Sequence, residues 1–110
     1  MRAFIYHDAK AVELPFEEGV TQSGKATLLW LHLDGKIDET RRWIEAQADI
    51  PEIARTALLA LETRPRSDIF GNGAIINLRA LSKNPDDDPD ALVSIRFWAE
   101  HGRIISVSLR

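Results

Sequence analysis

The last third of the chain alternates between apolar and polar positions, which is the pattern of half-buried β-strands. Between Leu92 and Ala99, the side chains expected on one face are Val93, Ile95, Phe97 and Ala99, and those expected on the other are Ser94, Arg96 and Trp98. After a turn at His101-Gly102, the apolar positions Ile105, Val107 and Leu109 alternate with Ser106 and Ser108. The alternation predicts two neighbouring antiparallel strands.

Three earlier apolar runs predict further strands. Ala26–Leu33 is apolar almost throughout, which is typical of a strand covered on both faces. Ala3–Tyr6 and Ala11–Leu14 are shorter and predict short strands. The stretch from Pro15 to Lys25 is polar and contains two glycines, so we expect a loop there.

Two helices are predicted in the middle of the chain. The first runs from about Asp38, whose carboxylate can cap the first turn, to Ala48. The second starts with the capping-box pair Asp49 and Glu52 and has Pro51 in its first turn. Its expected buried face follows helical spacing and consists of Ile50, Ile53, Ala54, Ala57, Leu58 and Leu61.

A hairpin is predicted between the helices and the last strands. Pro65 ends helical structure by Arg64, since the residue before a proline is pushed towards extended geometry. Ser67–Phe70 and Ala74–Leu81 are strand-like. Asn72-Gly73 between them supplies the two positive-φ residues of a type I′ turn.

This order of elements predicts an α+β (mixed α/β) fold: a mixed, mainly antiparallel sheet of about six to seven strands with two to three helices packed on one face. A length of 110 residues suits a single domain over residues 1–110. The residues expected beneath the helices are Val93, Ile95, Phe97, Ile105 and Val107. The opposite face is too apolar for a free surface and too polar for a finished core, so we expect something else to cover it. Its apolar residues are Ile75, Leu81 and Trp98, and its polar ones are Arg79, Ser94, Arg96, Ser106 and Ser108.

Composition narrows the functional classes. The net charge of −3 argues against a nucleic-acid surface, which is normally basic. The absence of cysteine excludes disulfides and thiolate metal sites. The chain contains no stretch of the roughly 20 apolar residues that a transmembrane helix needs, and its start lacks the apolar core of a signal peptide. We therefore expect these residues to be soluble and cytoplasmic.

The histidines offer one candidate chemistry. His7, His32 and His101 have neither the His-x-His nor the His-x-x-x-His spacing of a metal site. His32 lies in a buried strand run, so it is either a metal ligand or, as we expect, a core or edge histidine with one satisfied ring nitrogen. No nucleophile motif such as Gly-x-Ser-x-Gly is present. The sequence therefore predicts no catalytic residues and no enzyme.

Four carboxylates, Asp86, Asp87, Asp88 and Asp90, form the best candidate metal site, because divalent cations take several oxygen ligands. The run lacks the glycine and terminal glutamate of a calcium loop. It is either a weak site for zinc or magnesium or a solvated loop. No other cofactor is expected.

The segment Glu62-Thr63-Arg64-Pro65-Arg66 joins the second helix to the hairpin. Its charged residues Glu62, Arg64 and Arg66 are either an anion grip or ion pairs that fix the turn at Pro65. Exposed ion pairs of that kind contribute ~0–1 kcal/mol each. The structural role is the one we expect.

Three motifs in this order carry a family resemblance. They are Glu62-Thr63-Arg64-Pro65-Arg66, the strand end Trp30-Leu31-His32-Leu33-Asp34-Gly35, and the strand Val93-Ser94-Ile95-Arg96-Phe97-Trp98. Together they resemble the N-terminal cytoplasmic domain of the CorA-like divalent metal-ion transporters, and most closely the zinc-transport branch called ZntB. The likeness runs over nearly the whole chain.

The resemblance implies a cytoplasmic regulatory and assembly domain of a zinc or magnesium transporter in the inner membrane. In that family a mixed sheet lies between helices, and a long helix leads on to two transmembrane helices with a Gly-Met-Asn signature. The implied partners are other copies of the chain, in a pentamer, and the transmembrane domain of the same polypeptide. In magnesium-transporting members a regulatory metal binds between neighbouring cytoplasmic domains with the help of a carboxylate, whose nearest counterpart here is about Asn84, a residue that is not acidic. The alternative is a free-standing ligand- or protein-binding module without catalysis.

Overall fold

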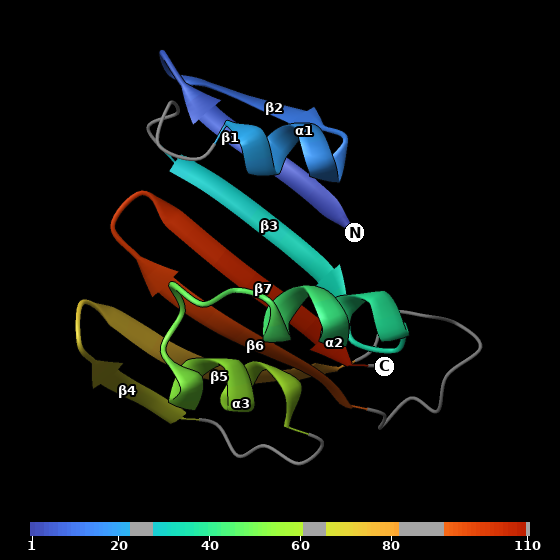
Figure 1. Cartoon of the computed structure of the whole chain (residues 1–110), viewed down its shortest axis with the longest axis vertical. Coiled ribbons are helices and arrows are strands. Elements are labelled where there is room, and N and C mark those ends of the chain that lie inside the picture. Colours follow the sequence, from blue (N-terminus) through green and yellow to red (C-terminus); the bar gives the residue numbers. More distant parts are fainter. Residues whose placement is uncertain (23–27, 61–65, 82–91, 110) are drawn as a thin grey trace.

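The computed structural model describes residues 1–22, 28–60, 66–81 and 92–109, and for residues 66, 80, 81, 92, 93 and 109 it describes the backbone. Within these ranges the chain forms one seven-stranded mixed sheet and three helices (Figure 1). The strands are β1 (Arg2–His7), β2 (Lys10–Leu14), β3 (Leu28–Asp34), β4 (Arg66–Phe70), β5 (Gly73–Leu81), β6 (Leu92–Glu100) and β7 (Arg103–Leu109). The helices are α1 (Phe16–Thr21), α2 (Asp38–Glu45) and α3 (Glu52–Leu59). The predicted α+β fold is confirmed.

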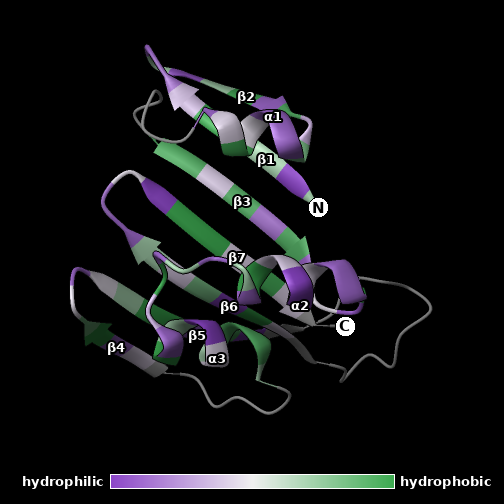
Figure 2. Cartoon of the chain, viewed as in Figure 1, coloured by the Kyte–Doolittle hydropathy of each residue, from purple (hydrophilic) through white to green (hydrophobic). Residues whose placement is uncertain are grey.

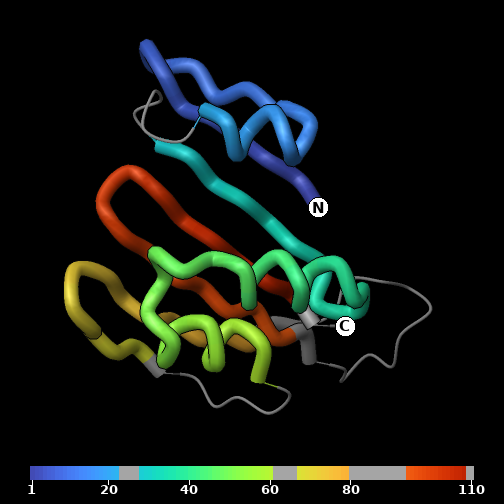
Figure 3. Tube along the Cα trace, in the orientation of Figure 1, coloured from blue at the N-terminus to red at the C-terminus, as the bar shows by residue number. Residues whose placement is uncertain are grey.

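The order of strands across the sheet is β2-β1-β3-β7-β6-β5-β4. Every neighbouring pair is antiparallel except β3 and β7, which are parallel and lie at the centre. The chain trace shows that α1 lies over β1 and β3 (Figure 3). The neighbouring helices α2 and α3 lie over the next strands of the sheet, β7 and β6. All three helices therefore cover the same face of the sheet, which we call the helical face.

The core lies between the helices and this face. Its buried apolar side chains come from both the sheet and the helical segments. They are Ala3, Phe16, Leu29, Leu31, Leu33, Ile44, Ile50, Ala54, Ala57, Leu58, Ile75, Trp98, Ile105 and Val107. Figure 2 shows apolar stretches on β3 and β7, with apolar and polar residues mixed along the helices. The opposite side of the sheet carries no helix from the described residues, and we call it the open face (Figure 1).

The two faces of β6 are the reverse of the sequence expectation. Trp98 and Arg96 are 0% and 1% exposed and lie on the helical face, paired with Ile105 and Val107. Ile95 and Phe97 instead point to the open face. The face built around Ile75 and Trp98 is the finished core, so the expectation that it awaits a cover was wrong. Alternation shows that a strand has two faces, but the choice between them depends on what packs there.

The close fit around Trp98 explains that choice. A Cβ atom on Gly73 would lie 2.4 Å from two ring carbons of Trp98, so only glycine leaves room for the indole at this position. Ile75, the partner of Trp98 on β5, is 2% exposed. The large ring thus fills the layer beneath α3, which neither Ile95 nor Phe97 does.

The stretch from Pro15 to Lys25 was predicted as a loop, but it contains α1. Phe16 packs its ring against Trp43 of α2 at 5.2 Å between centroids, and Gly19 lies against Ala3 of β1. A Cβ on Gly19 would come within 2.3 Å of the Ala3 Cβ. The helix is too short to be stable through propensity alone, so tertiary packing stabilises it.

The predicted helix starts are partly wrong. Asp38 is the first residue of α2, and Ile37 precedes it without a side-chain cap. Pro51 takes the cap position of α3, also without a side-chain hydrogen bond. Asp49 therefore forms no capping box; its carboxylate accepts a hydrogen bond from Arg103 at 2.9 Å instead. This contact ties the α2–α3 connection to the start of β7.

The predicted buried stripe of α3 is right at four positions: Ile50, Ala54, Ala57 and Leu58. Ile53 is 49% exposed, so its predicted burial was wrong. Leu61 lies outside the described residues. The helix ends at Leu59, which keeps the covered stripe narrow.

The turn between β4 and β5 differs from the predicted type I′ turn. Phe70 and Gly73 are paired across the hairpin, so Gly71 and Asn72 form the two-residue loop. Gly71 has φ +59°, and Asn72 is not among the positive-φ residues. Glycine at the first central position is typical of a type II′ turn. The second glycine, Gly73, serves the contact with Trp98 instead.

Candidate functional site

The residues singled out for chemistry mostly lie outside the described ranges. Asp86, Asp87, Asp88 and Asp90 do so, as do Glu62, Arg64 and Pro65. Arg66 begins β4. Within the described residues, no group of three or more histidine, aspartate or glutamate side chains is placed to hold a metal ion. The metal site at the aspartates therefore stays a prediction.

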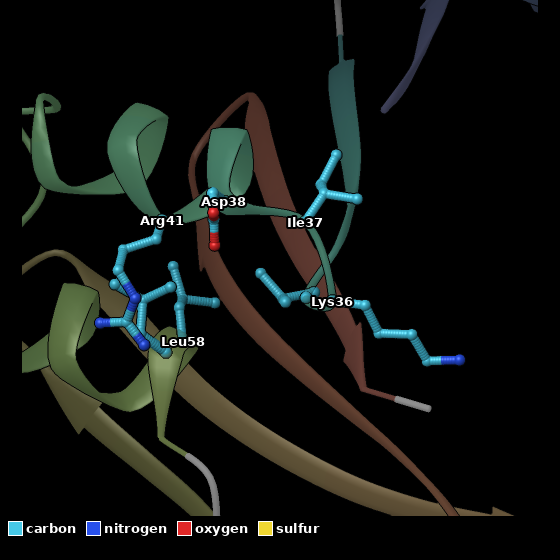
Figure 4. A pocket seen from close by; sticks show the side chains of 8 residues that line it. Lys36, Ile37, Asp38, Arg41 and Leu58 are labelled. Atoms are coloured by element: carbon cyan, nitrogen blue, oxygen red, sulfur yellow. The ribbon is translucent and has the colours of Figure 1, made fainter.

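A small cavity opens where β3 ends, between the start of α2 and the end of α3 (Figure 4). Its lining residues are Gly35, Lys36, Ile37, Asp38, Arg41, Leu58, Leu59 and Val107. The Lys36 side chain points away from the other labelled residues, whereas Arg41 lies beside Leu58 (Figure 4). The volume of about 130 Å³ is well below the ~300–1,000 Å³ of typical small-molecule sites. This cavity is too small for a cofactor or a metabolite.

The open face carries many apolar side chains. Strand register places on it Phe4, Tyr6, Leu28, Trp30, Ile69, Ile76, Leu78, Ile95, Phe97 and Ile104. Several of these are strongly exposed; Leu78 is 50% and Ile69 86% accessible to solvent. Large contiguous apolar surfaces on soluble domains usually mark interaction sites. The expected unfinished sheet face therefore exists, but it carries different residues from those predicted.

A chain of hydrogen bonds crosses the centre of this face, where β3 and β7 run parallel. The Trp30 Nε1–H donates to Ser106 Oγ at 2.8 Å. The His32 Nδ1 lies 2.7 Å from the same oxygen, and Ser108 Oγ lies 3.3 Å from His32 Nε2. We call these four side chains the polar chain. Sequence reasoning singled out His32 but not its partners, because its contacts come from residues more than seventy positions away.

One of these bonds has a fixed direction. An indole N–H can only donate, so Ser106 Oγ accepts from Trp30. A hydroxyl can donate or accept, so the contacts of His32 with Ser106 and Ser108 fit either neutral tautomer of the ring. His32 thus has a structural role near the centre of the sheet, with contacts at both ring nitrogens where one was expected.

The Ser106–His32 distance is that of a nucleophile and its base, but the surroundings do not suit catalysis. Ser106 is 0% exposed, so no substrate reaches its oxygen. The Trp30 N–H occupies one of the lone pairs that an attack would need. His32 Nε2 contacts a serine hydroxyl, where a catalytic triad places a carboxylate on the second ring nitrogen. The arrangement stabilises the sheet; it does not activate an oxygen.

The polar chain is bordered by charged and aromatic groups of the first strands. Arg2 faces His32 from β1 and binds Glu13 through two nitrogen–oxygen contacts of 2.9 Å. Its guanidinium also lies over the Phe4 ring, 5.0 Å from the centroid. The Phe4 ring lies 5.1 Å from Trp30, centroid to centroid. One corner of the open face is therefore polar and preorganised, and the remainder is apolar.

Burial lowers the pKa of His32, and the positive charges of Arg2 and the terminal ammonium group add to this effect. The Asp34 carboxylate opposes it. The surroundings of His32 therefore favour the neutral ring.

Known proteins are similar to this chain in sequence and in fold. The model of the family described as CorA-like Mg²⁺ transporter proteins matches residues 25–110. The chain belongs to the CorA-like family. Among curated relatives, this CorA-like chain is 33% identical over 106 residues to the zinc transport protein ZntB of Pectobacterium atrosepticum. It is 37% identical over 83 residues to the divalent cation transporter CmaX of Pseudomonas aeruginosa.

Solved structures agree with this assignment. The full-length CmaX structure superposes with a TM-score of 0.80 at 27% identity, over 100% of this CorA-like chain and 35% of that one. The cytoplasmic domain of ZntB from Vibrio parahaemolyticus gives a TM-score of 0.77 over 98% of this chain and 43% of that one, with 22% identity. The second match supports the fold alone. The resemblance to ZntB-like cytoplasmic domains seen in the sequence motifs is confirmed.

The matches also show how much of each relative the chain represents. It spans 32% of the length of the Pectobacterium ZntB and 25% of the length of the Pseudomonas CmaX, while 91% and 74% of the chain itself is covered. Across the described ranges, each helix is too short or too polar to cross a membrane.

Proposed function

We propose that this chain is a cytoplasmic regulatory and assembly domain of a CorA-like transporter of divalent cations, zinc or magnesium, and that it catalyses no reaction. Its family supports this role, since the relatives named above are transporters and the chain matches only a part of each. The burial of Ser106, the serine that lies beside His32, agrees with a domain that catalyses no reaction.

The open face is the observation that carries this proposal. We infer that a later part of the same polypeptide, present in the longer relatives, packs on it. The apolar strip through Ile76, Leu78 and Ile95 would be buried, and the polar corner at His32 and Ser108 would fix the orientation of the cover. Burial of such residues contributes roughly 25 cal/mol per Å² of apolar area removed from water.

Cysteine labelling tests whether the open face is covered, because the 110-residue chain contains no cysteine. Leu78 on the open face and Ile53 on α3 are almost equally exposed, at 50% and 49%. We expect Leu78→Cys to react with a thiol reagent as fast as Ile53→Cys in the 110-residue chain. In the longer transporter, Leu78→Cys should become protected and Ile53→Cys should stay reactive.

Two outcomes would contradict the proposal. Equal reactivity of both positions in the longer protein would show that the open face stays free, as a binding module for another partner requires. Protection of Leu78→Cys already in the 110-residue chain, at a concentration low enough for the chain to be monomeric, would show that the face is covered by the chain itself.

We also propose that any divalent cation bound by this chain is held weakly by the Asp86–Asp90 run. A loop that gathers several ligands loses conformational entropy, and this opposes tight binding. Titration calorimetry with zinc and with magnesium should show weak or no heat of binding. Micromolar affinity that Asp87→Asn with Asp88→Asn abolishes would show a stronger site than proposed.

A further inference from the structure

The ring of Trp30 lies on the open face and is held in place by its neighbours. Its Nε1–H donates to Ser106 Oγ at 2.8 Å, and its centroid lies 5.1 Å from that of the Phe4 ring. Phe4 lies in turn beneath the guanidinium of Arg2, which two contacts of 2.9 Å tie to Glu13. These contacts orient the indole before any partner packs on it.

A side chain that is already ordered costs less to bury in an interface. A mobile side chain loses conformational entropy when a partner immobilises it, and this loss weakens binding. Trp30 has paid most of this entropy when the chain folded. Leu78 is also exposed, but a leucine side chain has no polar group through which a neighbour could fix its rotamer.

The hydrogen bond of Trp30 also removes the usual obstacle to burying an indole. A buried indole N–H needs an acceptor, which an apolar partner cannot supply. Ser106 supplies it from within the chain and is itself 0% exposed. Trp30 as a whole is still 39% exposed, so an apolar group can pack against the ring without leaving the N–H unpaired.

The position of Trp30 in the sheet favours a central role in an interface. Its strand, β3, lies next to β7, which is the middle strand of the seven. Ile69 is more exposed, at 86%, but it lies on the edge strand β4. Residues that contribute most to binding are usually near the centre of an interface, and tryptophan is among the types enriched there.

We propose that Trp30 is the anchor of the open face, by which we mean the exposed residue of this face that contributes most to holding the later part of the polypeptide. That segment, the cover, packs an apolar side chain against the indole ring. The anchor rests on the proposed function, which supplies the cover: the chain spans 32% of the length of the Pectobacterium ZntB. It adds which residue of the open face holds the cover.

The rate at which Leu78→Cys reacts in the longer transporter reports how often the cover leaves the open face. Adding Trp30→Ala should raise this rate by about 30-fold, the effect of removing a strong interface contact. Adding Ile69→Ala on the edge strand should raise it by less than about threefold. Equal rises would overturn the anchor but leave the cover in place. Full reactivity of Leu78→Cys before either change would contradict the cover, and the anchor with it.

A cysteine in the core separates loss of the cover from loss of the fold. Ala57→Cys on α3 is buried, so it should stay protected in the Trp30→Ala background if only the cover is released. Parallel reactivity of this cysteine would show that Trp30 acts on the fold, and would overturn the proposal.

A milder variant tests the contribution of the hydrogen bond. Trp30→Phe keeps an aromatic ring next to Phe4 but removes the N–H that binds Ser106. We expect the reaction rate of Leu78→Cys to lie between those of the parent and of Trp30→Ala. A rate no higher than that of Ile69→Ala would show that the fixed orientation of the indole does not hold the cover.

Discussion

At the scale of single residues, the chain places polar groups in two contrasting environments. On the open face, Trp30, His32 and Ser106 satisfy one another. On the helical face, Arg96 is 1% exposed, and within the described part of the chain all three of its side-chain nitrogens are buried without a hydrogen-bond partner. Asn77, directly opposite on β5, also has a side-chain oxygen without a partner there. The contacts among Trp30, His32 and Ser106 fix the orientation of these side chains. The burial of Arg96 and Asn77, by contrast, lowers the stability of the fold.

Replacing Arg96 should therefore stabilise the fold. Burial lowers the pKa of the Arg96 guanidinium, which shows that the charged form is disfavoured there. Arg96→Met keeps the length of the side chain and removes the buried charge. We expect the free energy of unfolding to rise by about 1–4 kcal/mol, as found when buried charges give way to apolar groups. Urea unfolding measures this, and a loss of stability would show that Arg96 has a partner in the folded chain.

The matched control is Arg41→Met on α2. Arg41 is exposed and pairs with Glu45 four residues on, at 3.5 Å. Such surface changes usually alter stability by no more than about 0.5 kcal/mol. A similar gain from both variants would point to a general effect of methionine and not to burial.

His32 should make stability depend on pH. Its pKa is lowered in the folded chain, so the folded state favours the neutral ring more than the unfolded state does. The resulting stability is complete at pH values above the ordinary histidine pKa of about 6.5 and is lost as the pH falls towards the lowered folded value. His32→Gln should flatten the profile between pH 7 and 5, measured by thermal unfolding. An unchanged slope in this variant would assign the pH dependence to other groups.

At the scale of elements, α3 shows how packing selects among residues that look alike in sequence. Leu58 is 1% exposed and belongs to the core, while Ile53 on the same helix is 49% exposed. Both fit the apolar spacing of a buried stripe. The difference arises because the helix spans only Glu52–Leu59 and rests on the strands along one narrow line.

This pair of residues allows a matched test of the helix orientation. Leu58→Ala should lower the free energy of unfolding by ~2–5 kcal/mol, since it leaves a cavity in the core. Ile53→Ala should change it by about 0.5 kcal/mol or less. Denaturant unfolding of both variants is the measurement. Equal losses would mean that α3 is rotated from the position described above.

Gly73 is the first residue of β5, and it packs against the ring of Trp98, which lies far away in the sequence. Gly73→Ala places a methyl group 2.4 Å from ring atoms of Trp98, and the structure must shift to admit it. We expect a loss of about 1–3 kcal/mol, as for other overpacked sites. In a Trp98→Phe background the two clashing ring carbons are absent, so the same substitution should cost less. Strict additivity of the two changes in a double-mutant cycle would exclude the clash as the cause.

At the scale of the whole molecule, the helices of the described residues cover the sheet on one side only. The helical face contains the core, and the open face presents exposed apolar side chains around Leu78 and Ile69. Such surfaces promote association. Trp98, which the sequence placed on the uncovered face, is fully buried and takes no part in such association. The open face is the surface available for it.

We expect the 110-residue chain to self-associate at high concentration through the open face. Leu78→Lys should shift the population towards the monomer, because a charge in the contact must be desolvated. Ile53→Lys has nearly the same exposure but lies on α3, so it should have little effect. Light scattering over a concentration series is the measurement. A strictly monomeric parent chain, or equal effects of the two variants, would contradict this expectation.

The sequence alone determined the elements with strong patterns. The strands of the C-terminal meander, the hairpin at Gly71, and the two central helices lie close to their predicted positions, because alternation and helical spacing are local properties. The three motifs were also sufficient to indicate the CorA-like family. The acidic run at Asp86–Asp90 falls outside the described residues and remains a prediction from sequence.

Tertiary structure decided which face of each strand is covered and which short segment becomes a helix. Trp98 and Phe97 alternate equally well in sequence, but only Trp98 fits against Gly73 and beneath α3. The helix α1 depends on Gly19 packing against Ala3, a contact that its own sequence does not encode. The polar chain joins Trp30 and His32 to Ser106 across the parallel strand pair. Such contacts depend on which strands become neighbours, and local patterns carry no information about that pairing.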